Sequence, residues 1–317
     1  MKFSAIGIMS GTSLDGLDMA YCIFEYKHNQ WKYEIKHAET IAYDKEWKNK
    51  LQNIENQSAL EFNLTHVSYG HWIGKEVKKF IDKHHISVDF IASHGHTIFH
   101  QPEKQLTTQI GSGAAIAAES QTTTICDFRT LDVALKGQGA PLVPIGDKLL
   151  FSSYDACLNI GGISNISYNA NNKRIAYDIS PANMVLNHYA NQKNKAFDEG
   201  GHLARSGKLY TELFNSLNLL DFYATQPPKS LGKEWVLSKI FPLLNSFSLS
   251  TEDILHTFVE HIAFQIAKII TQQHLNKVLI TGGGAKNIYL IERIQNYANN
   301  AVLIIPDEKT IDYKEAL

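Results

Sequence analysis

Three glycine-rich turns are the stretches of this chain whose residues could do chemistry. The first, Gly11 to Gly16, joins two apolar runs and adds hydroxyl groups at Thr12 and Ser13. The second, Gly161 to Gly162, and the third, Gly282 to Gly284, also follow apolar, strand-like runs. Glycine lets backbone N–H groups turn into one concave surface, which suits a phosphate. Ordinary hairpin loops use the same residue types, so the first turn alone leaves both interpretations open.

The repetition of the pattern at three strand ends favours a nucleotide site over three unrelated loops. Two equivalent hairpins that face each other, together with a third turn at the start of a helix, would surround one nucleotide. The third turn fits because it follows the apolar run 277–281 and precedes a helical pattern over 287–298. The sequence therefore predicts a nucleotide held largely by backbone groups.

Asp127 is the strongest candidate for acid–base chemistry. It ends the apolar run 122–126 and stands two residues before Arg129, one of four arginines in the chain. A carboxylate at a strand end, held by Arg129, suits a general base. A surface ion pair or a turn-capping Asp explains the same residues, so position alone leaves these alternatives open.

Apolar runs and amphipathic patterns alternate along the chain and must position these groups. The alternation predicts an α/β protein with parallel strands, in which ligands bind at the carboxyl ends of strands, where His94 and Asp127 are expected. The expected strands are an opening hairpin through residue 24, 31–43, 90–92, 122–126, a second hairpin over 156–179, 277–281 and 301–305. The expected helices are 60–81 behind a capping box at Ser58 and Glu61, 112–119, one begun by Pro181, 202–219, 251–270 and 287–298.

The composition is that of a globular protein of 317 residues with a net charge of −2. This length permits two domains with sizeable cores. The balanced charge argues against a nucleic-acid partner, and no apolar run is long enough to span a membrane. Cys22, Cys126 and Cys157 lie far apart in apolar runs, which predicts reduced core thiols and a cytoplasmic protein.

Six segments resemble the anhydro-N-acetylmuramic acid kinases, which are part of the sugar kinase, Hsp70 and actin superfamily. The segments occur in the family's order along nearly the whole chain. They are Met9–Asp18 (MSGTSLDGLD), Asp127–Arg129 (DFR), Gly137–Pro144 (GQGAPLVP), Asn159–Asn165 (NIGGISN), Pro227–Ser230 (PPKS) and Thr281–Asn287 (TGGGAKN).

The resemblance implies a two-domain actin-like sugar kinase ATPase fold, with ribonuclease H-like domains and an active site in the interdomain cleft. The expected domains are residues 1–140, with the first phosphate turn and the sugar site, and residues 141–317, with the second phosphate turn and the adenosine turn. The family continues with helices that return to the first domain, whereas a helix opened by Asp312 stops at Leu317. The first domain is therefore expected to lack part of that support.

The resemblance also implies the reaction. The family uses ATP and Mg²⁺ to hydrolyse the 1,6-anhydro bond of 1,6-anhydro-N-acetylmuramic acid and to phosphorylate O6, which gives N-acetylmuramic acid 6-phosphate for cell-wall recycling. Asp127 matches the base that activates the attacking water. Asp15, Asp18 and Asp178 are candidates for holding Mg²⁺ through water, with turn capping as an equal alternative. The expected partner is this small amino sugar, and a homodimer is left open.

Two groups of site residues are expected, most of them in the matched motifs. The residues expected to bind ATP are Gly11, Thr12, Ser13, Leu14, Asp15, Gly16, Leu17, Asp18, Asn159, Gly161, Gly162, Ser164, Asn165, Gly282, Gly283, Gly284 and Asn287. The residues expected to bind the sugar are His94, Gly95, Thr97, Arg129, Gln138 and Glu260, and for Glu260 a solvated position on its helix is an equal alternative.

Two other activities of the superfamily are alternatives. His96 and His100 have the spacing of the metal-binding pair in threonylcarbamoyl-transfer ATPases, and His94 lies beside them. Zinc sites use three or four ligands, and no partner cluster is evident in the sequence, so a metal site has weak support. The second alternative is a chaperone-like ATPase or nucleotide switch, which would bind nucleotide without turning over a sugar.

Overall fold

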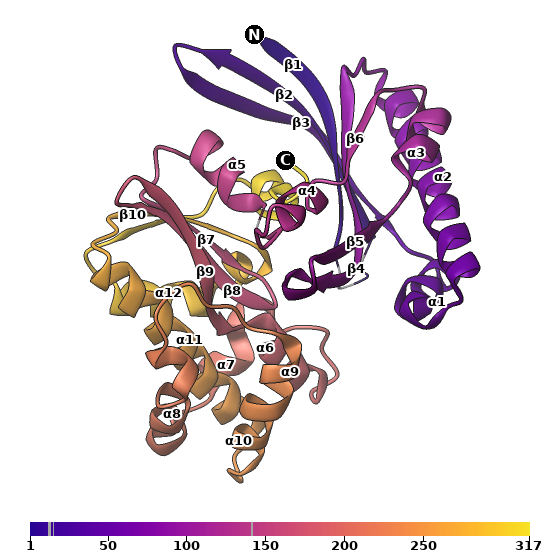
Figure 1. Cartoon of the computed structure of the whole chain (residues 1–317). Helices are drawn as coiled ribbons and strands as arrows, with labels where there is room; N and C mark the ends of the chain where they lie inside the picture. Colours follow the sequence, from indigo (N-terminus) through magenta and orange to yellow (C-terminus); the bar gives the residue numbers. More distant parts are fainter. Residues whose placement is uncertain (12–13, 15, 141) are drawn as a thin grey trace. The chain divides into compact units, whose positions relative to one another are not determined.

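The computed structural model describes residues 1–11, 14, 16–140 and 142–317 (Figure 1). The chain forms two compact units: unit 1 comprises Met1–Leu150 and Tyr313–Leu317, and unit 2 comprises Phe151–Asp312. The helix α5 (Val143–Leu150) is part of unit 1 because it packs on the strand β3 (Gln30–Ala42), whereas the sequence motifs assign it to the second expected domain. A functional division at residue 140 stays a prediction.

In its described residues, unit 1 holds a six-stranded sheet with the order β3-β2-β1-β4-β5, in which β6 also pairs with β4. β1, β2 and β3 form an antiparallel meander, and β4 joins β1 in parallel. β6 is parallel to β4, and β5 is antiparallel to it. The remaining bounds are β1 (Lys2–Ser10), β2 (Gly16–Lys27), β4 (Phe90–Gln101), β5 (Leu106–Ile110) and β6 (Thr124–Cys126).

Helices cover one face of the unit 1 sheet. The long helix α2 (Ala59–His84) begins at the predicted capping box, in which Ser58 and Glu61 accept hydrogen bonds from each other's backbone N–H. Its apolar stripe and the sheet build a core around Ile6, Ile73 and Ile91, which are fully buried. The other helices of this unit are α1 (Lys45–Asn53), α3 (Gly113–Ser120) and α4 (Thr130–Ala134).

The last residues of the chain cover the opposite face of the meander. Ala316 belongs to a small buried cluster with Cys22. A Cβ atom on Gly7 would lie 1.6 Å from the backbone oxygen of Ala316, so only glycine fits at this point of β1. Lys314 forms a buried ion pair with Asp147 of α5, with Nζ and Oδ1 2.8 Å apart. The C-terminal segment is thereby held to unit 1.

Unit 2 repeats the strand plan of unit 1. Its five described strands have the order β11-β10-β7-β8-β9. β7, β8 and β9 form an antiparallel meander, and β10 and then β11 are added in parallel. The bounds are β7 (Ala156–Ile160), β8 (Ile163–Ala170), β9 (Lys173–Pro181), β10 (Lys277–Thr281) and β11 (Val302–Ile304).

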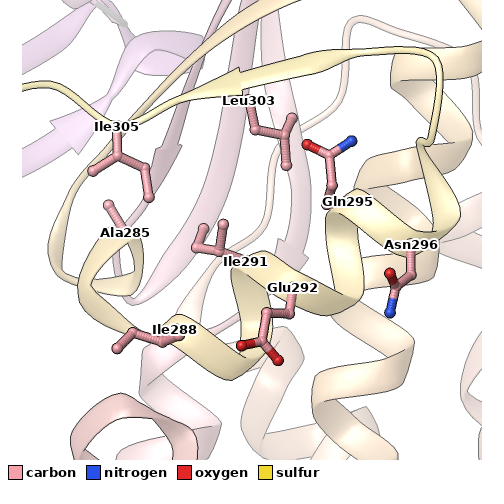
Figure 2. A pocket seen from close by; sticks show the side chains of 8 residues that line it. All are labelled: Ala285, Ile288, Ile291, Glu292, Gln295, Asn296, Leu303 and Ile305. Carbon is pink, nitrogen blue, oxygen red and sulfur yellow. The ribbon is translucent and has the colours of Figure 1, made fainter.

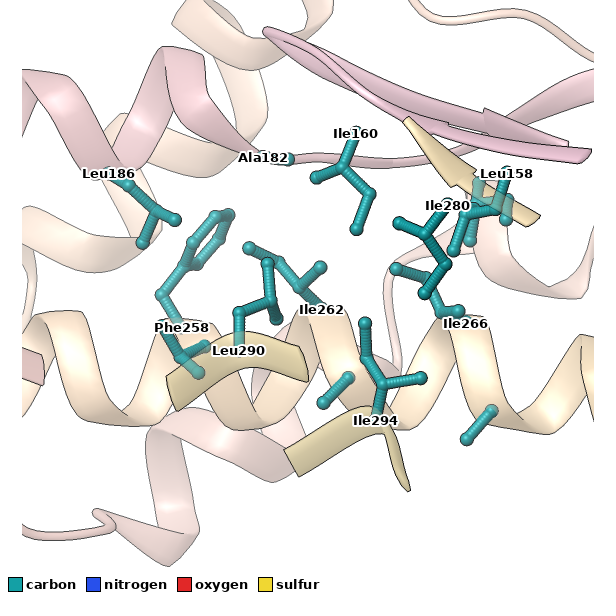
Figure 3. Packing of buried hydrophobic residues seen from close by; sticks show 14 of the residues in the cluster. Leu158, Ile160, Ala182, Leu186, Phe258, Ile262, Ile266, Ile280, Leu290 and Ile294 are labelled. Atoms are coloured by element: carbon teal, nitrogen blue, oxygen red, sulfur yellow. The ribbon is translucent and has the colours of Figure 1, made fainter. Parts of the chain in front are cut away.

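Two helices pack their apolar faces on the unit 2 sheet. Figure 3 shows Phe258 and Ile262 of α11 (Thr251–Gln272) and Leu290 of α12 (Ile288–Tyr297) near Ile160 and Ile280 of the strands, and all five side chains are fully buried. The other helices are α6 (Asn183–Asn191), α7 (His202–Ser206), α8 (Thr211–Asn218), α9 (Lys233–Trp235), α10 (Phe241–Asn245) and α13 (Glu308–Tyr313).

Two expected elements have different bounds. The strand expected at 90–92 continues to Gln101, because its second half pairs with β5, so His94 lies inside a strand instead of at its end. The single helix expected over 202–219 is two helices, α7 and α8. They separate at Gly207, where a Cβ would lie 2.1 Å from the backbone oxygen of Glu252. The other expected strands and the longer expected helices agree within a few residues.

Two local expectations are wrong. Cys126 is exposed at the end of β6 instead of lying in the core, although Cys22 and Cys157 are buried. The last helix, α13, begins at Glu308, so Asp312 lies near its end and does not open it. Within the described ranges, no helix combines the length and apolar character needed to cross a bilayer.

Candidate functional site

The first glycine turn starts where β1 ends, at Ser10. Leu14 donates its backbone N–H to the carbonyl of Gly11 at 3.3 Å and has a φ of 58°. β2 begins at Gly16, where a Cβ would lie 2.7 Å from the backbone oxygen of Ile41. The turn therefore lies between two strands of one sheet, and its end leaves no room for a side chain.

Other predicted ATP ligands of this segment have distinct environments. Leu17 is fully buried, so only its backbone can face a ligand. Asp18 of β2 accepts a hydrogen bond from the hydroxyl of Thr40 at 2.6 Å. Three further predicted ligands lie outside the described residues: Thr12, Ser13 and Asp15.

The second turn, Gly161 and Gly162, joins β7 to β8. Their carbonyls accept backbone N–H groups from the start of α6: Asn183 bonds Gly161 at 3.1 Å, and Ala182 bonds Gly162 at 2.8 Å. The predicted ligand Ser164 is buried and donates its hydroxyl to the backbone oxygen of Ser180 at 2.9 Å, so this hydroxyl already has a partner. A phosphate bound at this turn would therefore have to be held by backbone N–H groups.

The third turn, Gly282–Gly284, lies beside the second. β7 and β10 are parallel neighbours that place Asn159 opposite Thr281, so both strands end at one edge. Gly282 has a φ of 80°, and a Cβ there would lie 2.5 Å from Oδ1 of Asn159. Asn287 caps α12 by accepting the N–H of Leu290 at 3.0 Å. The structure thus brings the second and third turns together in unit 2.

A cavity of about 350 Å³ lies between α12 and β11, next to the third turn (Figure 2). Ile288, Ile291 and Leu303 contribute to its largely apolar wall. Its acidic side chain, Glu292, pairs with Arg205, whose Nη2 lies 2.6 Å from Oε2. None of the described lining residues is a cation, so the cavity does not suit a phosphate.

His94 and Arg129, two of the predicted sugar ligands, contact each other in unit 1. Arg129 donates from Nε to Nε2 of His94 at 2.9 Å and from Nη1 to the carbonyl of Gly139 at 2.7 Å. Nδ1 of His94 lies 2.8 Å from the carbonyl of Gly95, so the imidazole carries its proton on Nδ1. Burial, followed by the charge of Arg129, lowers the pKa of His94. The ring is therefore neutral and fixed in one tautomer.

Gln138 lines a second cavity, of about 480 Å³, in unit 1. Gly139, which also lines it, donates its N–H to Oδ2 of Asp132 at 2.6 Å and accepts the hydrogen bond from Arg129. The cavity wall is thus tied to the His94–Arg129 pair. Thr97, another predicted sugar ligand, lies further along β4, opposite Gln109 of β5.

Asp127 follows β6 and is exposed, with a φ of 61°. Its carboxylate accepts a hydrogen bond from the hydroxyl of Thr130. Arg129 bonds His94 and Gly139, which differs from the expectation that it holds Asp127. The catalytic role of Asp127 stays a prediction.

Glu315 is a carboxylate of unit 1 that the sequence analysis missed. Glu315 as a whole is exposed, but other atoms surround its carboxyl group, which lies within electrostatic range of Arg129, Lys314 and Asp18. Burial of the carboxyl group, followed by the charge of Asp18, raises the pKa of Glu315, whereas Lys314 and Arg129 lower it. Glu315 is remote from these motifs in the sequence, so only the folded chain reveals the grouping.

Asp178 of β9 is a half-buried carboxylate of unit 2. Leu231 donates its backbone N–H to Oδ2 at 2.8 Å, and the N–H of Asp178 donates to the carbonyl of Lys229 at 3.2 Å. These bonds fasten the loop that carries the PPKS motif to β9. Burial raises the pKa of Asp178, and the hydrogen bond from Leu231 partly offsets this effect. A raised pKa favours a general base, because the proton acceptor is then stronger.

Glu260, the remaining predicted sugar ligand, is buried in unit 2. Its carboxylate pairs with Arg293, whose Nη2 donates at 3.1 Å, and accepts the hydroxyl of Tyr297 at 2.9 Å. The structure therefore places Glu260 in a buried ion pair within unit 2.

The histidines of the metal hypothesis do not converge. Nδ1 of His96 lies 2.9 Å from the hydroxyl of Ser10, and Nδ1 of His100 lies 3.2 Å from the hydroxyl of Thr107. The residues that the structure describes include no group of three His, Cys, Asp or Glu side chains arranged to hold a metal ion.

Comparison with known proteins distinguishes between the activities of the superfamily. A family model described as anhydro-N-acetylmuramic acid kinase matches residues 3–317. The chain belongs to the anhydro-N-acetylmuramic acid kinase family. A relative of that name from Bacillus cereus (strain 03BB102) is 33% identical, and the alignment covers 98% of this chain and 89% of the relative. Another from Clostridioides difficile (strain 630) is also 33% identical, with 99% and 89% covered.

A solved structure has a similar fold. Component A of the (R)-2-hydroxyglutaryl-CoA dehydratase of Acidaminococcus fermentans aligns with a TM-score of 0.51, over 99% of this chain and 95% of that one. The sequences are 13% identical, so this likeness shows the fold alone. The predicted α/β fold and the predicted family are both confirmed. The chain is therefore an enzyme, a kinase that uses ATP and acts on a small-molecule sugar.

Proposed function

We propose that the enzyme hydrolyses the 1,6-anhydro bond of 1,6-anhydro-N-acetylmuramic acid and phosphorylates O6, which yields N-acetylmuramic acid 6-phosphate for cell-wall recycling. The observation that carries this proposal is the contact of Arg129 with Gly139 in unit 1, which joins the DFR and GQGAPLVP motifs of the matched family and also brings in His94. His94 and Gly139 hold the guanidinium of Arg129 in place through Nε and Nη1, so its Nη2 group can donate directed hydrogen bonds to a polar, acidic sugar.

The reaction needs one water and one ATP. Water attacks C1, the C1–O6 bond breaks, and O6 takes a proton and becomes a hydroxyl group. That hydroxyl then attacks the γ-phosphorus of ATP, its proton leaves to a base, and ADP departs. Catalysis of the second step rests mainly on positioning and on neutralising the phosphoryl charge.

The general base has two candidates. The sequence favours Asp127, which is exposed and accepts a hydrogen bond from Thr130. The structure supports Asp178, whose pKa is raised by burial and whose backbone and side chain both bond the PPKS loop. We propose Asp178 as the stronger base, and Glu315 as the carboxylate that sets the charge near Arg129.

ATP would be held by the three glycine turns and Mg²⁺ mainly by the phosphates and water. Asp18, with its carboxylate held by Thr40, is the described carboxylate best suited to contact the hydrated ion. Oxygen donors of this kind match the preference of Mg²⁺, which usually keeps several waters. We expect the enzyme in the cytoplasm, where ATP is available and cysteine thiols stay reduced. A homodimer stays a prediction.

The test is to mix the purified full chain with ATP, Mg²⁺ and 1,6-anhydro-N-acetylmuramic acid and to follow sugar phosphate and ADP. We expect both products in equal amounts, and no sugar phosphate when ATP is left out. ADP formed at the same rate with and without the sugar would contradict the proposal.

A further inference from the structure

Four polar side chains meet in the core at the last residue of β1. The hydroxyl oxygen of Ser10 lies 2.7 Å from that of Tyr43, 3.0 Å from that of Tyr69 and 2.9 Å from Nδ1 of His96. The two tyrosine hydroxyls are also hydrogen-bonded to each other. All four residues are buried, with at most 4% of their surface exposed. Bulk water is thus excluded, so these groups have to satisfy one another.

A count of protons fixes the state of the histidine. The four contacts need four protons, and the three hydroxyl groups of Ser10, Tyr43 and Tyr69 supply one each. The fourth proton has to come from His96. If Nδ1 of His96 carried no proton, one of the four buried contacts would bring two lone pairs together with no hydrogen atom between them. Such a contact is costly where water is excluded.

The ring is neutral as well as fixed. Burial, followed by the charge of His94, lowers the pKa of His96 to about 4. At neutral pH His96 is therefore an uncharged imidazole with its proton on Nδ1 and a bare Nε2.

The cluster lies at the start of the first phosphate turn. Ser10 and His96 are opposite each other in the β1–β4 register, and Gly11 follows Ser10 directly. Tyr69 comes from α2, and Tyr43 follows β3, so the end of β1 is bonded to three other parts of unit 1. We infer that His96 is a positioning residue for nucleotide binding, which donates Nδ1–H to Ser10 and so fixes the end of β1 from which the turn begins.

This inference rests on the proposed function, because it takes the first turn to bind ATP. It differs from a metal-ligand role for His96, because it assigns a task to the Nδ1–H group, whereas a metal ion would be bound through the lone pair of Nε2. It also explains why a histidine occupies a buried position of β4, opposite Ser10.

The first test is made on the wild-type protein, and a variant serves only to assign the signals. Nitrogen-15 spectra of the histidine side chains in the full chain report which ring nitrogen carries the proton, and the His96 signals are assigned by their loss in His96→Asn. We expect a protonated Nδ1 and a bare Nε2 at neutral pH. A proton on Nε2 instead overturns the inference.

The second test measures the affinity for a non-hydrolysable ATP analogue by calorimetry. His96→Leu removes the donor, whereas His96→Asn keeps an amide N–H close to the position of Nδ1. Losing one buried hydrogen bond should weaken binding by about tenfold in His96→Leu and Ser10→Ala, whereas His96→Asn should stay within about twofold of the wild type. The double variant should be little weaker than either single one, because both changes break the same contact.

His100→Leu is the matched control, since His100 lies on the same strand and bonds Thr107 instead of Ser10. It should bind the analogue like the wild type. A folded His96→Leu with unchanged affinity contradicts the positioning role. Nucleotide affinity and the spectra are measured without sugar, so a wild type that binds ATP but forms no sugar phosphate refutes only the proposed function.

Discussion

The two units share a strand plan but differ in the chemistry placed on it. In each unit an antiparallel meander of three strands is extended by parallel strands, β4 and β6 in unit 1 and β10 and β11 in unit 2. The strands of unit 2 end in glycine turns that pack closely, as at Gly282 against Asn159. Unit 1 instead groups polar and charged side chains, with Arg129 hydrogen-bonded to His94 and within electrostatic range of Glu315.

This difference separates two kinds of recognition. Closely packed glycine turns offer backbone N–H groups and let a ligand approach the backbone closely. Both features suit the phosphates of a nucleotide, whichever sugar is the substrate. Fixed, charged side chains offer directed contacts, which suit one particular small molecule. The comparison therefore favours the proposal that backbone groups recognise the nucleotide and that side chains of unit 1 recognise the sugar.

The largest effect is expected from Gly283→Val in unit 2. A Cβ at this position would meet only Nδ2 of Asn183, at 3.5 Å, which is an ordinary contact, so the variant should fold. The added side chain would fill the space that the nucleotide needs at this turn, and ATP binding measured by calorimetry should be lost. Gly146→Val is the control, because a Cβ on Gly146 has nothing within 4 Å. Normal ATP affinity in folded Gly283→Val would remove the backbone assignment.

The next effect concerns the carboxylates. Asp178→Asn keeps the shape of the side chain and removes the proton acceptor, so turnover of the anhydro sugar should fall by about 10² to 10⁴ while ATP still binds. Ring opening and phosphorylation should fall together, because O6 has no hydroxyl group until the bridge breaks. Asp127→Asn is the comparison variant. A larger loss in Asp127→Asn than in Asp178→Asn would return the base to unit 1 and to the sequence prediction.

A smaller effect, shared by both units, is the dependence of stability on pH. Burial lowers the pKa of His261 to about 3 in unit 2, and that of His96 to about 4 in unit 1, from the ordinary 6.5. As the pH falls below 6.5, the unfolded chain binds protons that the folded chain does not, so stability is present above this pH and is lost towards the folded pKa values. The loss should be about 2 kcal/mol per histidine between pH 7 and pH 5.

Urea unfolding of His261→Asn and His96→Asn at these two pH values measures this term. Each variant should lose less stability on acidification than the wild type, and the double variant should lose least. A slope equal to that of the wild type in either variant would show that its histidine already binds a proton in the folded protein.

The smallest effect is on thiol reactivity. Cys126 is exposed in unit 1, whereas Cys22 and Cys157 are buried, and burial raises the pKa of Cys22 to about 12. One thiol per chain should therefore react rapidly with an aromatic disulfide reagent, and Cys126→Ser should abolish that fast phase without changing the melting temperature. Two fast thiols would mean that one of the cores opens more readily than its packing suggests.

The sequence predicts best those features that depend on residues close together in the chain. The capping box at Ser58, the apolar stripe of α2 and the three glycine turns are visible in the sequence, because each depends on residues close together in the chain. The break at Gly207 was missed because its cause, the backbone of Glu252, lies far along the chain. Glu315 was missed for the same reason, since only the return of the C-terminal segment to unit 1 brings it near Arg129.

Isotope labelling tests the central claim, the coupling of bridge hydrolysis to phosphorylation, most directly. The reaction is run briefly in water enriched in oxygen-18, with ATP, Mg²⁺ and 1,6-anhydro-N-acetylmuramic acid, and the sugar phosphate is analysed by mass spectrometry. Because water attacks C1, we predict one heavy oxygen at C1 and none in the phosphate group, with one ADP formed for each labelled sugar. Heavy oxygen in free phosphate, without labelled sugar phosphate, would show that water attacks ATP instead and would contradict the account.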